Sequence, residues 1–508
     1  MTAALIARPA VRRTVRAVPV VPLASAAVVL VRLLFLTRPA TPDEAGFLVV
    51  ASQWHVGGTS LYGSYWVDRP PLLIGIFWLA DLTGGLPALR VIGALAAALT
   101  VVLLASTARR AFGPRAAPWT ALVAAALLVS PLLGAQAVNG ELLAAPFIAL
   151  GLRFAVEAVS TSDALTARGA ALGCGLTAML ALLVKQNMAD VVVFAAVCWL
   201  VAWRSGRLSG RTLADLLALA ATGAAVGYAV VMLWAAAHGT SPLAAYEATY
   251  PFRVRAGHVL ASTPGDTADV RLNHLALSAA LSVAPLVLVA FAAVALRRTR
   301  QAPVVWAIAG GAGYACVSIL AGGSYWLHYL VQAVPVVALA AGALGAATGR
   351  VTRWPARVLV PLTVASAVVA VAASLVAAAP APGATVGRTL AASSQPGDTV
   401  LSAFGDADIA YSTGMTSPYP YLWSLPSRTL DPQMALLRGI LAGPKAPTWI
   451  VVRGSHTRDR LASAGAWPII EARYRLVSIV CQRPIYLLRG IDRAPIDVQG
   501  RCGGMVLP

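Results

Sequence analysis

Long apolar stretches separated by short arginine-rich runs constrain this chain more than any other feature of its sequence. A helix needs about 20 mostly apolar residues to cross a bilayer, and about eleven segments of the 508-residue chain are of that kind. They are 17–36, 87–107, 117–134, 142–159, 169–185, 189–203, 212–236, 274–296, 303–321, 329–347 and 358–379. With 58% hydrophobic and 12% charged residues, the composition excludes both a soluble globular protein and a disordered one.

The basic residues predict how these segments are threaded through the membrane. Cytoplasmic loops carry an excess of Lys and Arg, so the formal net charge of +19 reflects topology and does not indicate a nucleic-acid partner. Threading the segments alternately from a cytoplasmic N-terminus puts one set of arginines inside: Arg109, Arg110, Arg115, Arg168, Arg204, Arg207, Arg211, Arg297, Arg298, Arg300, Arg350, Arg353 and Arg357. We therefore expect a multi-pass cell-membrane protein whose first segment is an uncleaved anchor helix.

The same threading leaves three segments outside the cytoplasm: 37–86, 237–273 and the tail from about residue 380. The apolar stretch Pro71–Leu82 is too short to span, so we expect a helix lying along the outer interface. The tail alternates helical stretches such as Asp431–Leu441 with short strand-like ones. These strand-like segments are Asp398–Phe404, Thr448–Arg453, Tyr474–Val480 and Ile485–Arg489.

The expected fold class is an all-α polytopic membrane protein with a small C-terminal α/β domain. We expect a transmembrane domain over 1–379, with 37–86 as its first outer loop, and a soluble extracytoplasmic domain over 380–508. Cys481 and Cys502 both lie in this tail. A disulfide between them would indicate an oxidising compartment, although two free thiols fit the sequence equally well.

Several sequence motifs are absent, which narrows the chemistry. A phosphate-binding loop needs Gly before its Lys, yet Val184 and Pro444 precede the only two lysines, Lys185 and Lys445. No His is followed by Glu and no Cys-x-x-Cys occurs, so a helical zinc-protease motif is also excluded. The glycines at 310, 311 and 313 lie in an apolar segment without a preceding strand, which favours close helix packing over dinucleotide binding.

Asp43 and Glu44 follow directly after the first apolar segment. A partly desolvated carboxylate at the membrane surface can have a raised pKa and act as a general base. The alternative is an acidic pair that begins a helix and interacts favourably with its dipole. The sequence leaves both interpretations open.

The rest of the first outer loop extends this pattern. Asp43-Glu44-Ala45 is followed by a helical stretch, by Gly58-x-x-x-Tyr62, and then by Arg69-Pro70-Pro71-Leu72. This combination resembles the first outer loop of polyprenyl-phosphate-sugar-dependent glycosyltransferases. These are membrane enzymes of the GT-C fold, in the protein-mannosyltransferase and aminoarabinose-transferase-like group.

Three later motifs extend the resemblance over residues 37–345. Asn139-Gly140-Glu141 begins the fourth segment, Leu183-Val184-Lys185-Gln186 ends the fifth, and Gly322–Tyr329 precedes Pro335. The resemblance implies an inverting transfer in which polyprenyl phosphate is the leaving group, so that no nucleotide site is needed. It also implies Asp43 as the base, with Glu44 and Glu141 as helpers; Asp43 and Glu141 could also bind an optional divalent ion such as Mg²⁺, Mn²⁺ or Ca²⁺.

For the donor phosphate the resemblance implies Lys185, Arg69, His328 and Tyr329. Arg69 stands where many members of the family have Lys. Each has an ordinary alternative: Lys185 could extend to the interface, Arg69 could pair with Asp68, and His328 could be an interfacial anchor. We expect Arg32 to extend to the interface.

Weaker candidates lie elsewhere on the outer side. Arg253 and Arg255 fall where the positive-inside rule disfavours Arg, which favours an anionic ligand, and Tyr62 and Tyr250 are further candidate contacts to donor or acceptor. Aromatic residues of the tail could stack on a sugar or could form its core: Tyr411, Tyr419, Tyr421 and Trp423. We interpret Asp406 and Asp408 as turn residues.

The sequence therefore predicts an integral-membrane glycosyltransferase acting on the extracytoplasmic face. Its expected partners are a polyprenyl-phosphate-linked sugar, membrane lipid, and a glycan, lipid or protein acceptor of the cell envelope. The alternative is a non-enzymatic transporter of a polyprenyl lipid or solute, which would show polar residues near the bilayer midplane and paired broken helices. A receptor or scaffold would leave Lys185 and Glu141 unexplained.

Overall fold

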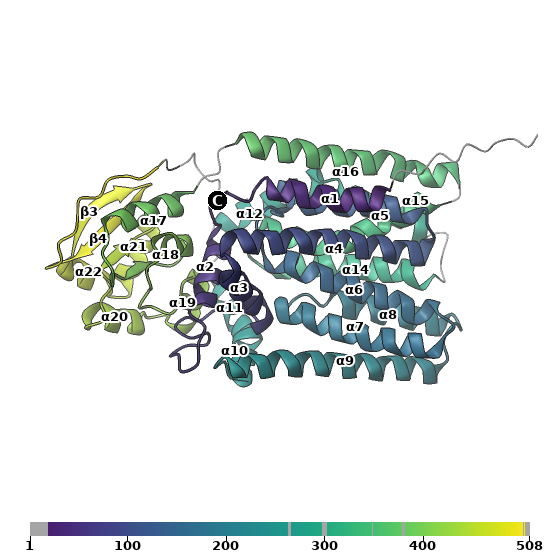
Figure 1. Cartoon of the computed structure of the whole chain (residues 1–508), viewed down its shortest axis with the longest axis horizontal. Helices are drawn as coiled ribbons and strands as arrows, with labels where there is room; N and C mark the ends of the chain where they lie inside the picture. Colours follow the sequence, from purple (N-terminus) through teal and green to yellow (C-terminus); the bar gives the residue numbers. More distant parts are fainter. Residues whose placement is uncertain are drawn as a thin grey trace, which may run out of the picture.

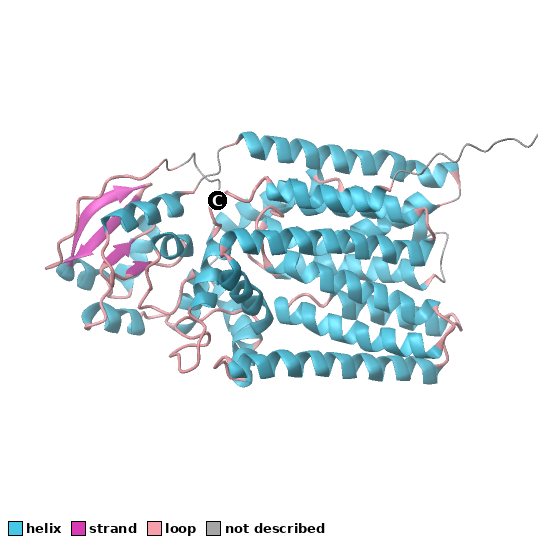
Figure 2. Cartoon of the chain, viewed as in Figure 1, coloured by secondary structure: helices cyan, strands magenta, loops and turns pink. Residues whose placement is uncertain are grey.

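A computed structural model describes residues 19–262, 266–296, 302–347, 349–377, 381–500 and 502. A bundle of long helices with their axes side by side forms one end of the molecule, and a small sheet covered by short helices forms the other. Four short helices lie between them (Figures 1 and 2). Arg297, Arg298 and Arg300, which the sequence placed inside, fall outside the described residues.

The helices of the bundle coincide with the expected apolar segments. They are α1 (Val20–Leu33), α4 (Leu86–Phe112), α5 (Ala116–Val129), α6 (Gly140–Ser160), α7 (Ala164–Val184), α8 (Asp190–Arg204), α9 (Gly210–Ala237), α14 (Pro303–Ala321), α15 (Val334–Ala346) and α16 (Arg350–Val376). Within the described residues, seven helical segments are long and apolar enough to cross a membrane, or up to eight if one bent pair counts as a span. The polytopic helical class is therefore confirmed.

The apolar segment expected over 274–296 is not one continuous helix. The chain bends by 63° between α12 (Asp266–Leu281) and α13 (Ala284–Phe291), and a π-helical turn, η2 (Ala292–Leu296), follows. Val283 at the break has a φ of 64°, a left-handed conformation that a β-branched residue rarely adopts. The Ser282 hydroxyl donates to the Ala279 carbonyl at 2.6 Å, which ends the first helix.

Small residues bring the apolar helices close together. A Cβ on Gly175 of α7 would lie 1.7 Å from the Ala220 carbonyl oxygen of α9, and one on Gly223 would lie 2.0 Å from the Leu172 carbonyl oxygen. Gly310 and Gly311 of α14 likewise contact α8 and α15, as their sequence context predicts. Close backbone approach through glycine is the usual packing of helices that have no hydrophobic driving force between them in lipid.

Four short helices form the layer at one end of the bundle: α2 (Pro42–Ser52), α3 (Pro71–Thr83), α10 (Pro242–Thr249) and α11 (Pro251–Ala261). Each begins with proline, whose fixed φ suits the first helical position. The helix expected near Pro71 is present, and its Leu73, Ile74 and Phe77 are fully buried. Short 3₁₀ turns, η1 (Pro131–Leu133) and η3 (Leu327–Ala333), complete this end of the bundle.

The C-terminal α/β unit, residues 381–500, contains a four-stranded sheet in the order β1-β2-β4-β3. The strands lie where the sequence predicts them: β1 (Val400–Ser402), β2 (Trp449–Val451), β3 (Tyr474–Val480) and β4 (Arg483–Leu488). The first two are parallel and the other pairs are antiparallel. The helices are α17 (Pro382–Ser393), α18 (Ala407–Thr413), α19 (Ser424–Leu430), α20 (Ala435–Ala442), α21 (Gly454–Ser463) and α22 (Trp467–Arg473).

A disulfide joins Cys481, in the turn between β3 and β4, to Cys502. Of the two alternatives that the sequence left open for these cysteines, the structure thus has the bonded one. The bridge ties the C-terminal end of the chain to the edge hairpin of the sheet.

Candidate active site

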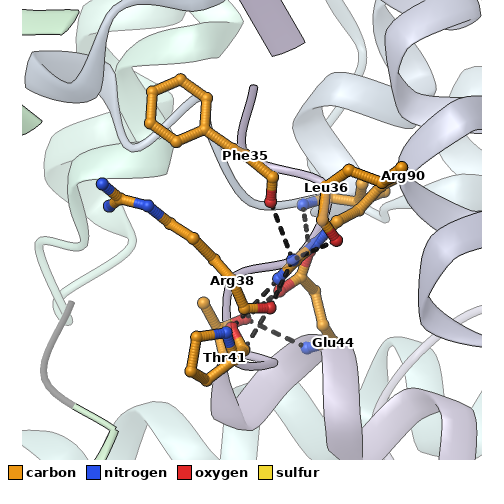
Figure 3. A network of polar contacts seen from close by, with 8 residues as sticks. Phe35, Leu36, Arg38, Thr41, Glu44 and Arg90 are labelled. Carbon is orange, nitrogen blue, oxygen red and sulfur yellow. Dashed lines mark hydrogen bonds and ion pairs between the residues drawn. The ribbon is translucent and has the colours of Figure 1, made fainter. Parts of the chain in front are cut away.

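Glu44 is fully buried and its carboxylate is occupied by structural contacts (Figure 3). It forms a capping box with Thr41 at the start of α2 and accepts hydrogen bonds from Arg90 at 3.0 and 3.2 Å. The Val138 amide donates to it at 3.0 Å. Arg90 in turn donates to the carbonyls of Phe35, Leu36, Arg38 and Pro39. Glu44 therefore fixes the start of the first outer loop and has no oxygen free for a substrate.

Asp43 precedes Glu44 in the first turn of α2, yet its surroundings differ. It is partly exposed, and its Oδ1 accepts a hydrogen bond from the Trp423 indole nitrogen at 3.0 Å. Within the described part of the chain, its Oδ2 has no hydrogen-bond donor. Of the two neighbouring acids, only Asp43 has an oxygen available to accept a proton.

Glu141 and Lys185 form a buried ion pair, although 44 residues separate them in the sequence. Glu141 lies in the first turn of α6, whose N-cap is the Asn139 side chain, and Lys185 ends α7. The Lys185 ammonium also lies 4.6 Å from the centroid of the Tyr329 ring. His328 Nε2 is 3.9 Å from Glu141 Oε1. Four of the residues that the sequence selected thus meet at one point.

Asp68 joins two cations of the outer layer. Its carboxylate lies 2.8 Å from Arg69 and 2.7 Å from Arg253, which is on α11. The guanidinium of Arg69 also lies 5.6 Å from the centre of the Phe47 ring. Tyr62 is fully buried and its hydroxyl donates to the Arg69 carbonyl at 2.6 Å. Asp68 appeared in the sequence only as an alternative partner for Arg69, and its second partner comes from a distant helix.

Arg69 connects these two groups of charges. Burial by itself would lower the pKa of Arg69, but the charges of Asp68, Asp43 and Glu141 act in the opposite direction and raise it. The charges of both Asp43 and Lys185 also act on His328. Asp43, Arg69, Glu141, Lys185 and His328 are therefore members of a single electrostatic cluster, which we call the outer charge cluster together with Asp68, Arg253 and Tyr329.

A partly buried network of polar side chains connects two parts of this cluster. Asn187 donates to Ser318 at 2.9 Å and to Gln332 at 3.3 Å, and Gln332 donates to Asp190 at 3.0 Å. The Tyr314 hydroxyl donates to the Asn187 carbonyl at 2.7 Å. These contacts tie the turn after Lys185 to η3, which carries His328 and Tyr329. The network could not be predicted from the sequence, because its members lie on separate elements.

Arg271 of α12 is a further cation close to the cluster. Its guanidinium lies 4.9 Å from the centre of the Trp326 ring, and Tyr329 lies nearby. Within the described residues its buried Nε has no partner. The rule that disfavours outer arginines, which selected Arg253 and Arg255, also applies to Arg271 in the expected outer loop.

Two weaker candidates are not members of the cluster. Arg255 lines a cavity of about 340 Å³ on another side of α11, together with Trp66, Glu247 and Leu430. Tyr250 is 39% exposed and packs against Tyr246 with ring centres 5.6 Å apart. Tyr250 contacts the outer charge cluster through its backbone, since its carbonyl accepts a hydrogen bond from the Arg253 amide at 3.0 Å.

Three other expectations need correction. Arg32 does not extend to the interface: it is buried and donates to the Leu128 carbonyl at 3.1 Å and to that of Ala135. Asp406 and Asp408 are buried and are more than turn residues, since Asp406 forms an ion pair with Arg483 at 2.7 Å. Low-dielectric surroundings make such partners necessary, and the sequence does not show which chain segments supply them.

Of the tail aromatic residues, Tyr419 belongs to the core. Its hydroxyl contacts Ser427 and Asp431 at 3.0 Å. Tyr421 packs against Trp66 of the first outer loop, with ring centres 6.2 Å apart. Trp423 reaches Asp43, as described above.

The optional divalent ion expected at Asp43 and Glu141 stays a prediction. Within the described residues, no three His, Cys, Asp or Glu side chains gather as a metal site. Glu141 Oε1 is paired with Lys185, and Arg69 interacts with both acids. No chemical step is assigned to a metal.

No family model matches the sequence, and no curated protein matches it. Solved structures do match its fold. ArnT from Cupriavidus metallidurans bound to undecaprenyl phosphate is 17% identical, with a TM-score of 0.63, over 91% of this chain and 97% of that one. The archaeal oligosaccharyltransferase AglB from Archaeoglobus fulgidus, in complex with an inhibitory peptide and a dolichol-phosphate, is 13% identical, with a TM-score of 0.59, over 90% of this chain and 72% of that one. The chain therefore has the GT-C fold of these proteins.

Proposed function

We propose that this protein is an integral-membrane glycosyltransferase that moves a sugar from a polyprenyl-phosphate donor to an acceptor on the extracytoplasmic face. The observation that carries the proposal is the outer charge cluster, in which the partly exposed Asp43 carboxylate keeps Oδ2 without a donor among the described residues and interacts with Arg69 and His328. The Oε2 atom of Glu141 also lacks a donor there, but it is buried. The fold supports it, because ArnT of the same fold was solved with undecaprenyl phosphate bound.

In the proposed reaction, Asp43 Oδ2 accepts the proton of an acceptor hydroxyl. The acceptor oxygen forms a bond to the anomeric carbon as the bond from that carbon to the phosphate oxygen breaks, with inversion in a single displacement. The electron pair of the broken bond stays on the departing polyprenyl phosphate. Preorganised cations stabilise such developing charge best where water is excluded.

Arg69, Lys185 and Arg253 are the side chains that would bind the phosphate, with His328 and Tyr329 beside them. Each cation is already held by an acid, Asp68 or Glu141, so its position is fixed before the donor arrives. Preorganisation of this kind avoids a reorganisation cost at the moment of reaction. Glu141 and Asp68 are thus assigned to holding the cations.

The sidedness of the reaction rests on two observations. The α4–α5, α6–α7 and α8–α9 connections, which have arginines within them or in the adjoining helix ends, lie at the end of the bundle away from the C-terminal α/β unit (Figure 1). The positive-inside rule assigns this end to the cytoplasm. The disulfide between Cys481 and Cys502 is typical of an oxidising compartment. Both support an extracytoplasmic site.

One observation favours the alternative of a transporter. The bent α12–α13 pair breaks by 63°, and broken helices bind substrates in many transporters. Such transporters have two broken helices in corresponding positions and a site near the bilayer midplane. The outer charge cluster instead lies at the end of the bundle, so we favour the transferase.

The test uses purified protein and a panel of polyprenyl-phosphate sugars, with consumption of each donor as the measurement. We expect one donor to be consumed by the wild-type protein and none by Asp43→Asn, because the amide cannot accept the proton. Asp81→Asn, in α3 of the same outer layer, is the matched control and should retain transfer. Full activity of Asp43→Asn would refute the base, and no consumption of any donor would refute the transferase.

A further inference from the structure

The C-terminal α/β unit contacts the proposed base through one side chain. Trp423, which directly precedes α19, donates from its indole nitrogen to Asp43 Oδ1 at 3.0 Å, across 380 residues of sequence. Its ring also packs on Phe47 of α2, with centres 5.1 Å apart, and Phe47 in turn lies under Arg69. Trp423 therefore contacts both the base and the aromatic ring beneath a phosphate-binding cation.

The local sequence of α2 makes room for this indole. A Cβ on Gly46 would lie 2.4 Å from one ring carbon of Trp423 and 3.0 Å from the Ala407 Cβ. Any side chain at this position would push the ring away from Asp43, which lies one helical turn earlier. The absence of a side chain at Gly46 is thus a condition of the Trp423–Asp43 contact.

Further hydrogen bonds fix the segment that carries Trp423. The Ser417 amide donates to the Tyr65 hydroxyl at 2.8 Å, and the Trp66 amide donates to the Pro420 carbonyl at 3.1 Å. Beyond Trp423, Arg428 donates to the Val259 carbonyl of α11 at 3.3 Å. The segment is held on both sides of Trp423, so the position of the indole is set by the docking of the whole unit.

The indole N–H has a defined chemical effect on a carboxylate. It can donate but cannot accept a hydrogen bond, so it cannot take the proton from the acceptor. Because this hydrogen bond occupies Oδ1, it orients the Asp43 carboxylate and leaves Oδ2 for the acceptor.

We propose that Trp423 is a positioning residue for Asp43, through which the C-terminal α/β unit completes the active site of the membrane helices. This inference rests on the proposed transferase function. It assigns the unit a role in the chemical step, beyond any contact with the acceptor.

The test compares kcat and KM of transfer for the full-length protein and for Trp423→Phe, which keeps a ring and removes the N–H. A hydrogen bond to a charged group is worth roughly a tenfold to hundredfold factor, so we expect kcat to fall by about tenfold or more. The KM for the donor should change little.

Gly46→Ala offers a second way to break the same contact without altering either partner. It should lower kcat as Trp423→Phe does, with the KM for the donor nearly unchanged. Gly439→Ala is the matched control, since Gly439 is a helical glycine of the C-terminal α/β unit with nothing within 4 Å of an added Cβ. Its kcat should match the wild type.

Two outcomes would overturn the inference. A kcat close to the wild-type value in both variants would show that Trp423 does not position the base. Thermal unfolding of Asp43→Ala, Trp423→Phe and the double variant provides a readout that needs no activity, because alanine removes the acceptor of the hydrogen bond. Additive effects in that cycle would show that the two side chains are not coupled, whether or not any donor is turned over.

Discussion

Glu44 and Asp43 are neighbours in the sequence, but their environments lead to opposite expectations for mutation. Glu44→Gln would leave the Arg90 guanidinium buried without its counter-ion, which costs about 3–5 kcal/mol. We expect a marked fall in the thermal unfolding temperature of the detergent-solubilised protein, with transfer per folded molecule close to wild type. Asp43→Asn should show the reverse. Loss of transfer by a Glu44→Gln protein of unchanged stability would contradict this assignment.

Arg253 and Arg255 are two residues apart on α11 and form a matched pair. Arg253 lies 2.7 Å from Asp68, whereas Arg255 lines the separate cavity. Arg253→Ala should raise the KM for the lipid donor by about tenfold, the usual effect of one charge-assisted hydrogen bond. Arg255→Ala should leave that KM near wild type. Equal effects of the two substitutions in donor titrations would show that the cluster does not bind the phosphate.

Asp408 makes the stability of the C-terminal α/β unit depend on pH. Burial, followed by the nearby charge of Asp406, raises the pKa of Asp408 from 3.8 to about 6. Because the folded-state pKa is raised, this stabilisation is complete below about pH 4 and is lost as the pH rises through about 6. Two pH units correspond to at most about 3 kcal/mol.

We therefore expect thermal unfolding of the unit in the full-length protein to occur at a lower temperature at pH 7.5 than at pH 4.5. Asp408→Asn should remove most of that difference and stabilise the unit at pH 7.5. The pKa of Asp398 shifts in the opposite direction. Burial would raise this pKa, but hydrogen bonds from Arg493 and other donors lower it. Asp398 therefore affects the stability of the unit only below about pH 4. An unchanged pH dependence in Asp408→Asn would contradict the assignment.

At the scale of elements, glycines determine how closely α7 and α9 approach. A Cβ on Gly175 would overlap the Ala220 carbonyl oxygen, and overpacking of this kind typically costs about 1–3 kcal/mol. Gly175→Ala should lower the thermal unfolding temperature of the protein. Gly169→Ala, on the same helix with open space around it, should not. Equal unfolding temperatures for the two variants would show that α7 and α9 are not held this closely.

Helix ends show what the sequence could and could not predict at this scale. Prolines at the starts of α2 and α3, and the apolar lengths of α4 to α9, are local signals that the structure follows. The break at Val283 has no such signal, because neither glycine nor proline occupies the left-handed position. Packing of α13 against other helices must hold that conformation, so the bend could not be read from the local sequence.

At the scale of the whole molecule, sidedness is the property that remains to be measured in cells. Thr59 lies in the first outer loop, and Ser162 lies in the connection between α6 and α7; both are exposed. In a Cys316→Ser background, Thr59→Cys should react with a membrane-impermeant thiol reagent on intact cells. Ser162→Cys should react only after permeabilisation. The opposite pattern would reverse the topology and remove the extracytoplasmic site.

The candidate site combines both kinds of information. The resemblance to GT-C glycosyltransferases selected Asp43, Glu141, Lys185 and His328 in the sequence, and the cost of an ionisable group at a helix end also indicated Lys185. The network of Asn187, Gln332 and Asp190 could not be predicted, because its members are separated in sequence and joined only by helix packing.

The sequence by itself determined the polytopic helical class, the positions of the four strands and the set of polar residues at the helix ends. Hydropathy, chain length and strand alternation are local properties that every segment carries wherever it packs. Tertiary structure alone decided which acid was free and which was paired, because a counter-ion is supplied by whichever helix lies alongside. Arg90 thereby forms an ion pair with Glu44. Trp423, from the C-terminal α/β unit, donates a hydrogen bond to Asp43.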